Sequence, residues 1–191
     1  MKSDTRSSLI EVATGQVRRQ GYSGFSYADL ASVAGIRKPS IHHHFPTKED
    51  LGVELVALYS ERISQELDRI ESETEDPIER LRGFAGLYRQ ALDEKQGCLC
   101  GVLAAEMAAL PPRVQAGVRQ FFRVNLRWLE RTLGSGCTSG RLRIGVEPRR
   151  DARTVLATLQ GALLVALSVQ QPASFDQAVE GLLRGLSTDG A

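Results

Sequence analysis

The sequence predicts an all-α fold, in which an N-terminal helix-turn-helix domain (residues 1–46) is joined by a long helix to a larger helical domain (residues 47–191). Two observations predict it. Apolar residues recur at spacings of three and four along most of the chain, and the alternation typical of half-buried strands is nearly absent. Pro, Gly and capping residues also divide this pattern into segments of helical length. The chain is long enough for one compact fold or two small domains.

The first two helices are indicated by an apolar face and by their end signals. Leu9, Ala13 and Val17 fall on one face of a first helix, and Gly21 stands where a C-terminal cap is expected. Ser26 can cap a second, short helix, because its hydroxyl accepts a hydrogen bond from a free N–H of the first turn.

The segment from Tyr27 to Phe45, YADLASVAGIRKPSIHHHF, carries the most specific pattern in the chain. Ala31 is small enough to let two helices cross closely. Gly35 fits a turn with positive φ, and Ile41 can hold the second helix against the first. This spacing is that of a DNA-reading helix-turn-helix, whose second helix enters the major groove.

A long helix is expected next, over Thr47–Ile70, with Thr47 and Asp50 as its cap. Prolines favour the starts of the later helices. The remaining segments are a helix from Pro77, a segment around Cys98–Leu110, a helix after Pro112, a Gly/Ser loop over residues 134–140, and helices over Pro148–Val169 and from Pro172 to near Leu186.

Charge is distributed unevenly along the chain, although the formal net charge is only +1. Residues 1–48 contain seven basic and three acidic side chains, whereas acidic residues cluster between Glu66 and Asp76. A basic N-terminal module on a more acidic body is typical of a head that binds a polyanion, and the alternative is chance patterning on solvated faces.

The side chains expected to contact DNA surround the second helix of the motif and the starts of its neighbours. They are Ser26, Tyr27, Arg37, Lys38, Ser40, His42, His43 and Lys48. The chain's three histidines are consecutive, and neighbours on a helix differ by about 100°. A metal site is therefore not expected there.

Residues 6–51, and above all Gly21–Leu51, resemble the N-terminal domain of the TetR family of bacterial repressors. The resemblance implies a three-helix DNA-binding head, a helical regulatory body, and a homodimer that binds a near-palindromic double-stranded operator and responds to a small-molecule effector. His42 departs from the pattern, because the family usually has Tyr at this position as a phosphate contact.

The resemblance also implies that the last two helices form the dimer interface. Candidate interface residues are small or branched and apolar or weakly polar: Thr158, Gly161, Ala162, Val165, Ala166 and Ser168. An effector pocket is implied between central helices. Its candidates are Phe84, Tyr88, Met107, Phe121 and Trp128, for which plain core packing is the alternative.

The segment Gln96–Gly101 places Cys98 and Cys100 at a predicted helix start, where free N–H groups make a thiol more reactive. A Gly-Cys-Leu stretch here resembles the subgroup of the family that senses quinones and other electrophiles through a cysteine. The alternative is that both thiols are buried as small apolar groups. A zinc site that includes Cys137 is less favoured, because no fourth ligand is placed.

Other functional classes have weaker support in the sequence. Sequence signatures of hydrolases, zinc proteases and phosphate-binding loops are absent, so no catalytic residue and no cofactor are expected. A small cysteine-dependent enzyme and a non-specific DNA-binding protein remain as alternatives. No secretion signal is recognised, and Ala162–Leu167 is too short to span a bilayer. With three cysteines, an odd number, a reducing cytoplasm is expected.

Overall fold

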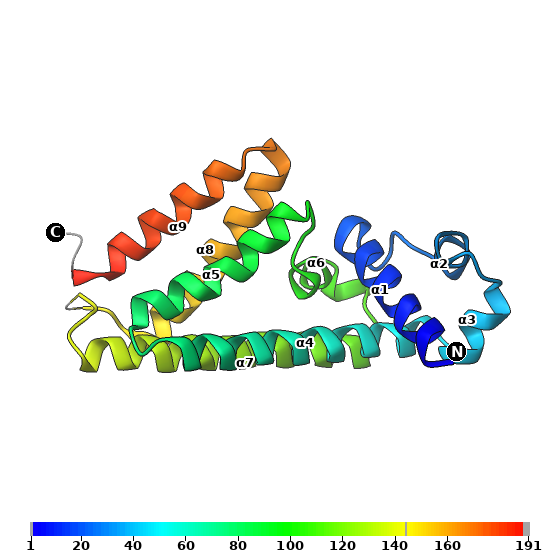
Figure 1. Cartoon of the computed structure of the whole chain (residues 1–191), viewed down its shortest axis with the longest axis horizontal. Coiled ribbons are helices and arrows are strands. Elements are labelled where there is room, and N and C mark those ends of the chain that lie inside the picture. The colour runs from blue at the N-terminus through cyan, green and yellow to red at the C-terminus, as the bar shows by residue number, and fades with distance from the viewer. Residues whose placement is uncertain (1, 144, 189–191) are drawn as a thin grey trace. The chain divides into compact units, whose positions relative to one another are not determined.

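The computed structural model describes residues 2–143 and 145–188, and within these ranges the chain is helical, with one isolated bridge between Leu142 and Ser187 and no strand. The all-α prediction is confirmed (Figure 1). The elements are α1 (Lys2–Gln20), α2 (Tyr27–Ala34), α3 (Lys38–His44), α4 (Lys48–Glu73), α5 (Pro77–Asp93), α6 (Leu99–Ala105), the 3-10 helix η1 (Met107–Ala109), α7 (Pro112–Thr138), α8 (Pro148–Val169) and α9 (Pro172–Leu186).

The predicted helix ends are confirmed at the head. Gly21 has φ +83° and its N–H donates to the Val17 carbonyl at 2.9 Å, which ends α1. Ser26 forms a capping box with Asp29 at the start of α2. The Thr47 hydroxyl donates to the Asp50 carboxylate at 2.7 Å, and the Asp50 N–H donates to the Thr47 hydroxyl at 3.1 Å. Local sequence therefore sets the boundaries of these helices.

The predicted loop over residues 134–140 is wrong, because α7 continues to Thr138. A Cβ on Gly136 would lie 2.6 Å from Leu142 and 3.1 Å from Pro77, so this glycine lets both side chains approach the helix closely. The Ser139 N–H still donates to the Ser135 carbonyl at 2.9 Å. Tertiary packing thus outweighs the low helix propensity of the Gly/Ser sequence.

The chain divides into two compact units. Met1–Arg62 and Cys98–Phe121 form the first, and Ile63–Gly97 and Phe122–Ala191 form the second. In the second unit α5, α8 and α9 pack on one another. Phe84 and Phe175 are each only 1% exposed in its core. Figure 1 shows α8 and α9 meeting at the short turn between them.

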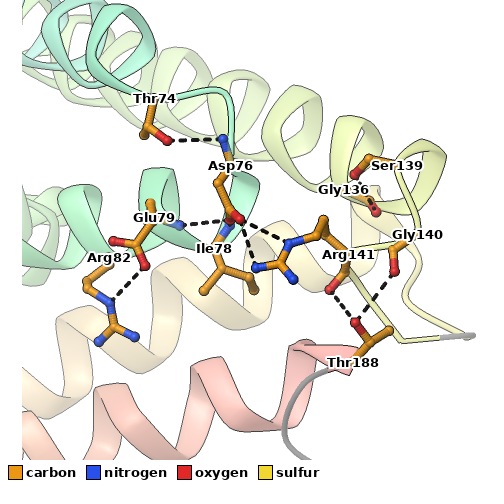
Figure 2. A network of polar contacts seen from close by, with 10 residues as sticks. All are labelled: Thr74, Asp76, Ile78, Glu79, Arg82, Gly136, Ser139, Gly140, Arg141 and Thr188. Atoms are coloured by element: carbon orange, nitrogen blue, oxygen red, sulfur yellow. Dashed lines mark hydrogen bonds and ion pairs between the residues drawn. The ribbon is translucent and has the colours of Figure 1, made fainter.

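A polar network ties three chain segments of the second unit together (Figure 2). The Asp76 carboxylate caps α5 by accepting the Ile78 N–H at 2.8 Å, and it accepts Arg141 Nε and Nη2 at 3.0 and 2.8 Å. The Thr188 hydroxyl donates to the Arg141 carbonyl at 3.2 Å. Burial alone would raise the pKa of Asp76, but these bonds and the arginine charge lower it. The α7–α8 connection is thereby held against the start of α5.

Candidate nucleic-acid interface and sensing site

The α2–turn–α3 segment has the packing that its sequence predicts. Leu30 and Ile41 are completely buried, so the two helices share a core. Gly35 has φ +66°, and its N–H and that of Ile36 both donate to the Ala31 carbonyl. This positive φ is the conformation for which glycine has no steric cost. The helix-turn-helix geometry follows from these contacts.

The outer face of α3 is polar and basic. Arg37, Lys38, Ser40, His42 and His43 are all exposed at or on this helix, while the neighbouring His44 is half-buried. The positions chosen from the sequence on α3 therefore lie on an accessible surface. Such a row of basic and hydrogen-bonding side chains can meet both phosphates and base edges.

Tyr27, a predicted DNA contact, is buried and has an internal role. Its hydroxyl lies 2.9 Å from the Phe45 carbonyl oxygen and 2.6 Å from the Thr47 carbonyl oxygen, and the two carbonyls share its single proton. Its ring packs edge-on against His42, with centroids 4.9 Å apart. Burial, assisted by the charge of Asp50, raises the pKa of Tyr27 to about 12. Tyr27 thus ties the start of α2 to the α3–α4 junction.

Lys48 and Ser26, two other predicted contacts, also bond within the head. The Lys48 ammonium donates to the Tyr22 and Phe25 carbonyls, both at 2.6 Å, and lies 4.5 and 4.4 Å from the centroids of these two rings. Burial lowers the pKa of Lys48, although the negative charges of Glu106 and Asp29 act in the opposite direction and raise it. The Ser26 hydroxyl is engaged in the cap of α2. Two of the three ammonium protons of Lys48 are therefore used internally.

The two clustered cysteines are buried in the first unit. Cys98 is the N-cap residue of α6 and is 6% exposed, and Cys100 is completely buried. The Tyr59 hydroxyl donates to Cys98 Sγ at 3.6 Å. Burial, with a smaller contribution from Cys98, raises the pKa of the Cys100 thiol well above its usual value. Cys98 consequently has the more polar surroundings of the two, and Tyr59 was missed because its spacing on α4 is that of an ordinary core residue.

The five aromatic and Met candidates for an effector pocket do not form one cluster. In the second unit the Phe84 ring stacks on Trp128 at 5.5 Å and meets Tyr88 edge-on at 5.6 Å. Phe121 instead packs against Tyr59 in the first unit, where Met107 lies in η1. Among the described residues of the second unit, Trp128 Nε1 and Thr132 Oγ1 are buried without a hydrogen-bond partner.

Helix α8 presents a broad apolar face to solvent. Leu164, Val165 and Val169 are 67%, 55% and 50% exposed, and Gly161 and Ser168 are exposed on the same side. Of the other interface candidates, Thr158 and Ala162 are half-buried, whereas Ala166 is completely buried. Ala166 packs inside its own subunit and has no surface to offer a partner. Within the described chain α8 is also the one helix long and apolar enough to cross a membrane, with a mean hydropathy of 1.6 over its most apolar 18 residues.

Comparison with known proteins agrees with the fold. The family model described as bacterial regulatory proteins of the tetR family matches residues 9–55. The model of the tetracyclin repressor-like C-terminal domain matches residues 77–182. Together they include the helix-turn-helix and most of the second unit.

Individual relatives extend over nearly the whole chain. The transcriptional repressor DhaR of Mycobacterium sp. (strain GP1) is 26% identical over 164 residues, which is 85% of this chain and 82% of DhaR. A TetR-family regulator from Agrobacterium tumefaciens has a crystal structure with a TM-score of 0.95 and 33% identity, covering 98% of this chain and 100% of that one. The reduced form of Escherichia coli NemR shares the fold, with a TM-score of 0.82, 23% identity and coverage of 98% and 100%. The chain therefore belongs to the TetR family, and it is a ligand-responsive, DNA-binding transcriptional regulator.

Proposed function

We propose that this protein is a cytoplasmic repressor without catalytic activity, which binds a near-palindromic operator as a homodimer and leaves it when an effector acts on residues 47–191. The observation that carries the proposal is the exposed basic face of α3 beside a correctly packed turn. Arg37, Lys38, Ser40, His42 and His43 are the proposed contacts on α3. Ser26, Tyr27 and Lys48 support the head mainly from inside.

The Arg37→Ala variant tests whether the head is oriented with the exposed face of α3 toward the DNA. Arg37 is exposed at the N-cap of α3, where its guanidinium can pair with a phosphate. We expect several-fold weaker binding to every duplex. The slope of log affinity against log salt should be smaller by about 1.8, because each of the two subunits loses one phosphate contact worth about 0.9. Fluorescence anisotropy with the protein's own upstream DNA, at several salt concentrations, measures both.

The control for this prediction is Arg123→Ala, which removes an exposed cation from α7 in the second unit. Its affinity and salt slope should equal those of the wild type. An Arg37→Ala protein that binds like the wild type contradicts the orientation. Equal affinity for operator and scrambled duplex at fixed salt supports the alternative of a non-specific DNA-binding protein.

The proposed dimer surface is the apolar outer face of α8, with support from α9. The candidates kept from the sequence are Thr158, Gly161, Ala162, Val165 and Ser168. Leu164 and Val169 are added because they are exposed on the same face. Three large aliphatic side chains at one end of a helix form the kind of patch that association usually covers. A two-fold dimer would bury the patch of each subunit against its copy.

For the effector we propose a thiol-reactive electrophile that acts on Cys98. This thiol lies at the start of α6 and accepts a hydrogen bond from Tyr59. With a quinone, the sulfur would form a bond to a ring carbon. The thiol proton would pass to one ring oxygen and the hydrogen of the attacked carbon to the other, which gives a hydroquinone thioether. NemR, whose reduced form has been solved, is similar in fold.

The experiment compares operator binding of wild type and Cys98→Ser, each with and without benzoquinone. We expect an adduct on Cys98 by mass spectrometry, and at least tenfold weaker binding in the wild type but not in Cys98→Ser. Cys100→Ser and Cys137→Ser are matched controls that should respond like the wild type. An adduct on Cys98 without any change in affinity contradicts thiol sensing. Loss of a catalysed reaction in Cys98→Ser, with no DNA binding in the wild type, favours the alternative of an enzyme.

A non-covalent effector is the second candidate, and a specific observation favours it. Trp128 Nε1 and Thr132 Oγ1 lie one helical turn apart on α7 as buried groups without a protein partner. The Trp128 ring stacks on Phe84, which in turn contacts Tyr88. A flat ligand with a hydrogen-bond acceptor suits these groups, because a buried donor left unpaired is costly. Operator binding that is indifferent to benzoquinone directs the search to such ligands.

A further inference from the structure

The segment that follows the buried cysteines makes a direct contact with the DNA-binding head. Glu106 comes immediately after α6 and lies in the same compact unit as the head. Its carboxylate accepts the Tyr22 N–H at 2.9 Å and the Ser23 N–H at 2.8 Å. These two amides belong to the turn between α1 and α2, 83 and 84 residues away in sequence.

The turn is shaped to receive this carboxylate. Gly21 has φ +83°, and a Cβ at this position would lie 1.9 Å from Oε1 of Glu106. Two successive N–H groups that follow a residue of positive φ form a concave site for an anion. Gly21 is therefore needed both to end α1 and to leave space for the glutamate.

The opposite side of the same turn is held by Lys48. Its ammonium donates to the Tyr22 and Phe25 carbonyls. Burial alone would raise the pKa of Glu106, but the bonds from Ser23 and Tyr22 and the charge of Lys48 outweigh it and lower the pKa. The turn is thus bound between an anion that follows α6 and the cation that begins α4.

We propose that Glu106 is the positioning residue through which the Cys98–Ala109 segment sets the conformation of the DNA-binding head. The DNA-binding consequence rests on the proposed function, whereas the conformational link does not. α6 is a single helix of seven residues with Cys98 at one end and Glu106 at the other. A change at the N-cap that tilts or shifts this helix displaces the carboxylate from the Tyr22 and Ser23 amides. The turn then loses its hydrogen bonds to the carboxylate, and α2 and α3 are no longer held in position by this contact.

The test is the Glu106→Gln variant of the full-length protein. Glutamine keeps the size of the side chain but offers one acceptor and one NH₂ group to two N–H donors, and it removes the charge opposite Lys48. We expect the backbone amides of Tyr22 and Ser23 to exchange at least about tenfold faster than in the wild type. Faster exchange should extend through α2 and α3, whereas the exchange rates of α5, α8 and α9 should not change. Operator affinity should fall about tenfold. Glu61→Gln removes an exposed carboxylate from α4 and is the charge control.

Gly21→Ala reaches the same contact from the other side, because its methyl group would displace the carboxylate. We expect the same pattern of exchange, and no further effect when Glu106→Gln is added. If Glu106→Gln proves too unstable to fold, Glu106→Asp keeps the charge but is too short to reach both amides, and it should give the same pattern.

Faster exchange confined to Tyr22 and Ser23, with α2 and α3 as in the wild type, overturns the proposal and leaves Glu106 as a local cap. Independent effects of the two substitutions also overturn it. If the wild type binds no operator, the proposed function fails, and the exchange pattern alone decides the role of Glu106.

Discussion

Replacing Leu164 by Glu is expected to convert the dimer into monomers and to abolish operator binding at concentrations where the wild type is saturated. Leu164 is 67% exposed in the subunit, beside Val165 and Val169. Burial of one such side chain contributes about 1.5–3 kcal/mol, and two-fold symmetry makes each substitution count twice. A carboxylate buried at the same place would in addition lose its hydration. Sedimentation equilibrium measures the mass, and anisotropy measures operator binding.

The matched control is Leu58→Glu, which makes the same change at a side chain that is 39% exposed on α4. This variant should remain dimeric. Because both recognition helices must reach half-sites about one DNA turn apart, a monomer has only half of the contacts. A Leu164→Glu protein that is dimeric and binds the operator normally would place the interface elsewhere on the molecule.

Replacing Tyr27 by Phe is expected to lower both the free energy of unfolding and operator affinity, although the ring stays in place. The lost hydroxyl shares its one proton between the carbonyls of Phe45, a buried group, and of Thr47. A buried polar group left without its partner costs about 1–3 kcal/mol. We expect a loss of that size in urea unfolding, and about tenfold weaker operator binding, because α3 is no longer tied to α2.

The salt dependence separates this internal role from a direct DNA contact. If Tyr27 acts from inside, the slope of log affinity against log salt stays at the wild-type value while stability falls. Tyr88→Phe, which removes the acceptor of a 3.3 Å bond from Gln160 in the second unit, is the control and should leave operator affinity unchanged. Normal stability together with weaker DNA binding would instead favour the phosphate contact predicted from the sequence.

Local features of the sequence were sufficient to predict the helical elements and the turn of the head. Gly21, Ser26, Gly35 and the Thr47–Asp50 pair act within a few residues of their own position, so their roles can be recognised without knowledge of the fold. The α2–α3 motif was predicted for the same reason. Its Ala, Gly and Ile positions are constrained by the contact between two adjacent helices.

Other features were decided by partners far apart in the sequence. Gly134–Thr138 remains helical because Leu142 and Pro77 pack against Gly136, which overrides the local preference for a loop. Ala166 resembles its neighbours in size and polarity, yet it faces the core while Val165 faces solvent. A periodic pattern shows that a helix has an apolar face, but not whether that face meets its own subunit or a partner.

The functional residues divide in the same way. The sequence alone determined which side chains of α3 are available on its surface, because the motif fixes which face is buried. Only the tertiary structure directed Tyr27 and Lys48 to internal carbonyls, separated Phe121 from Phe84 and Trp128, and brought Glu106 to the amides of Tyr22 and Ser23. The physical reason is that a hydrogen bond or ring contact depends on distances of a few ångströms between elements, and spacing along the chain does not specify those distances.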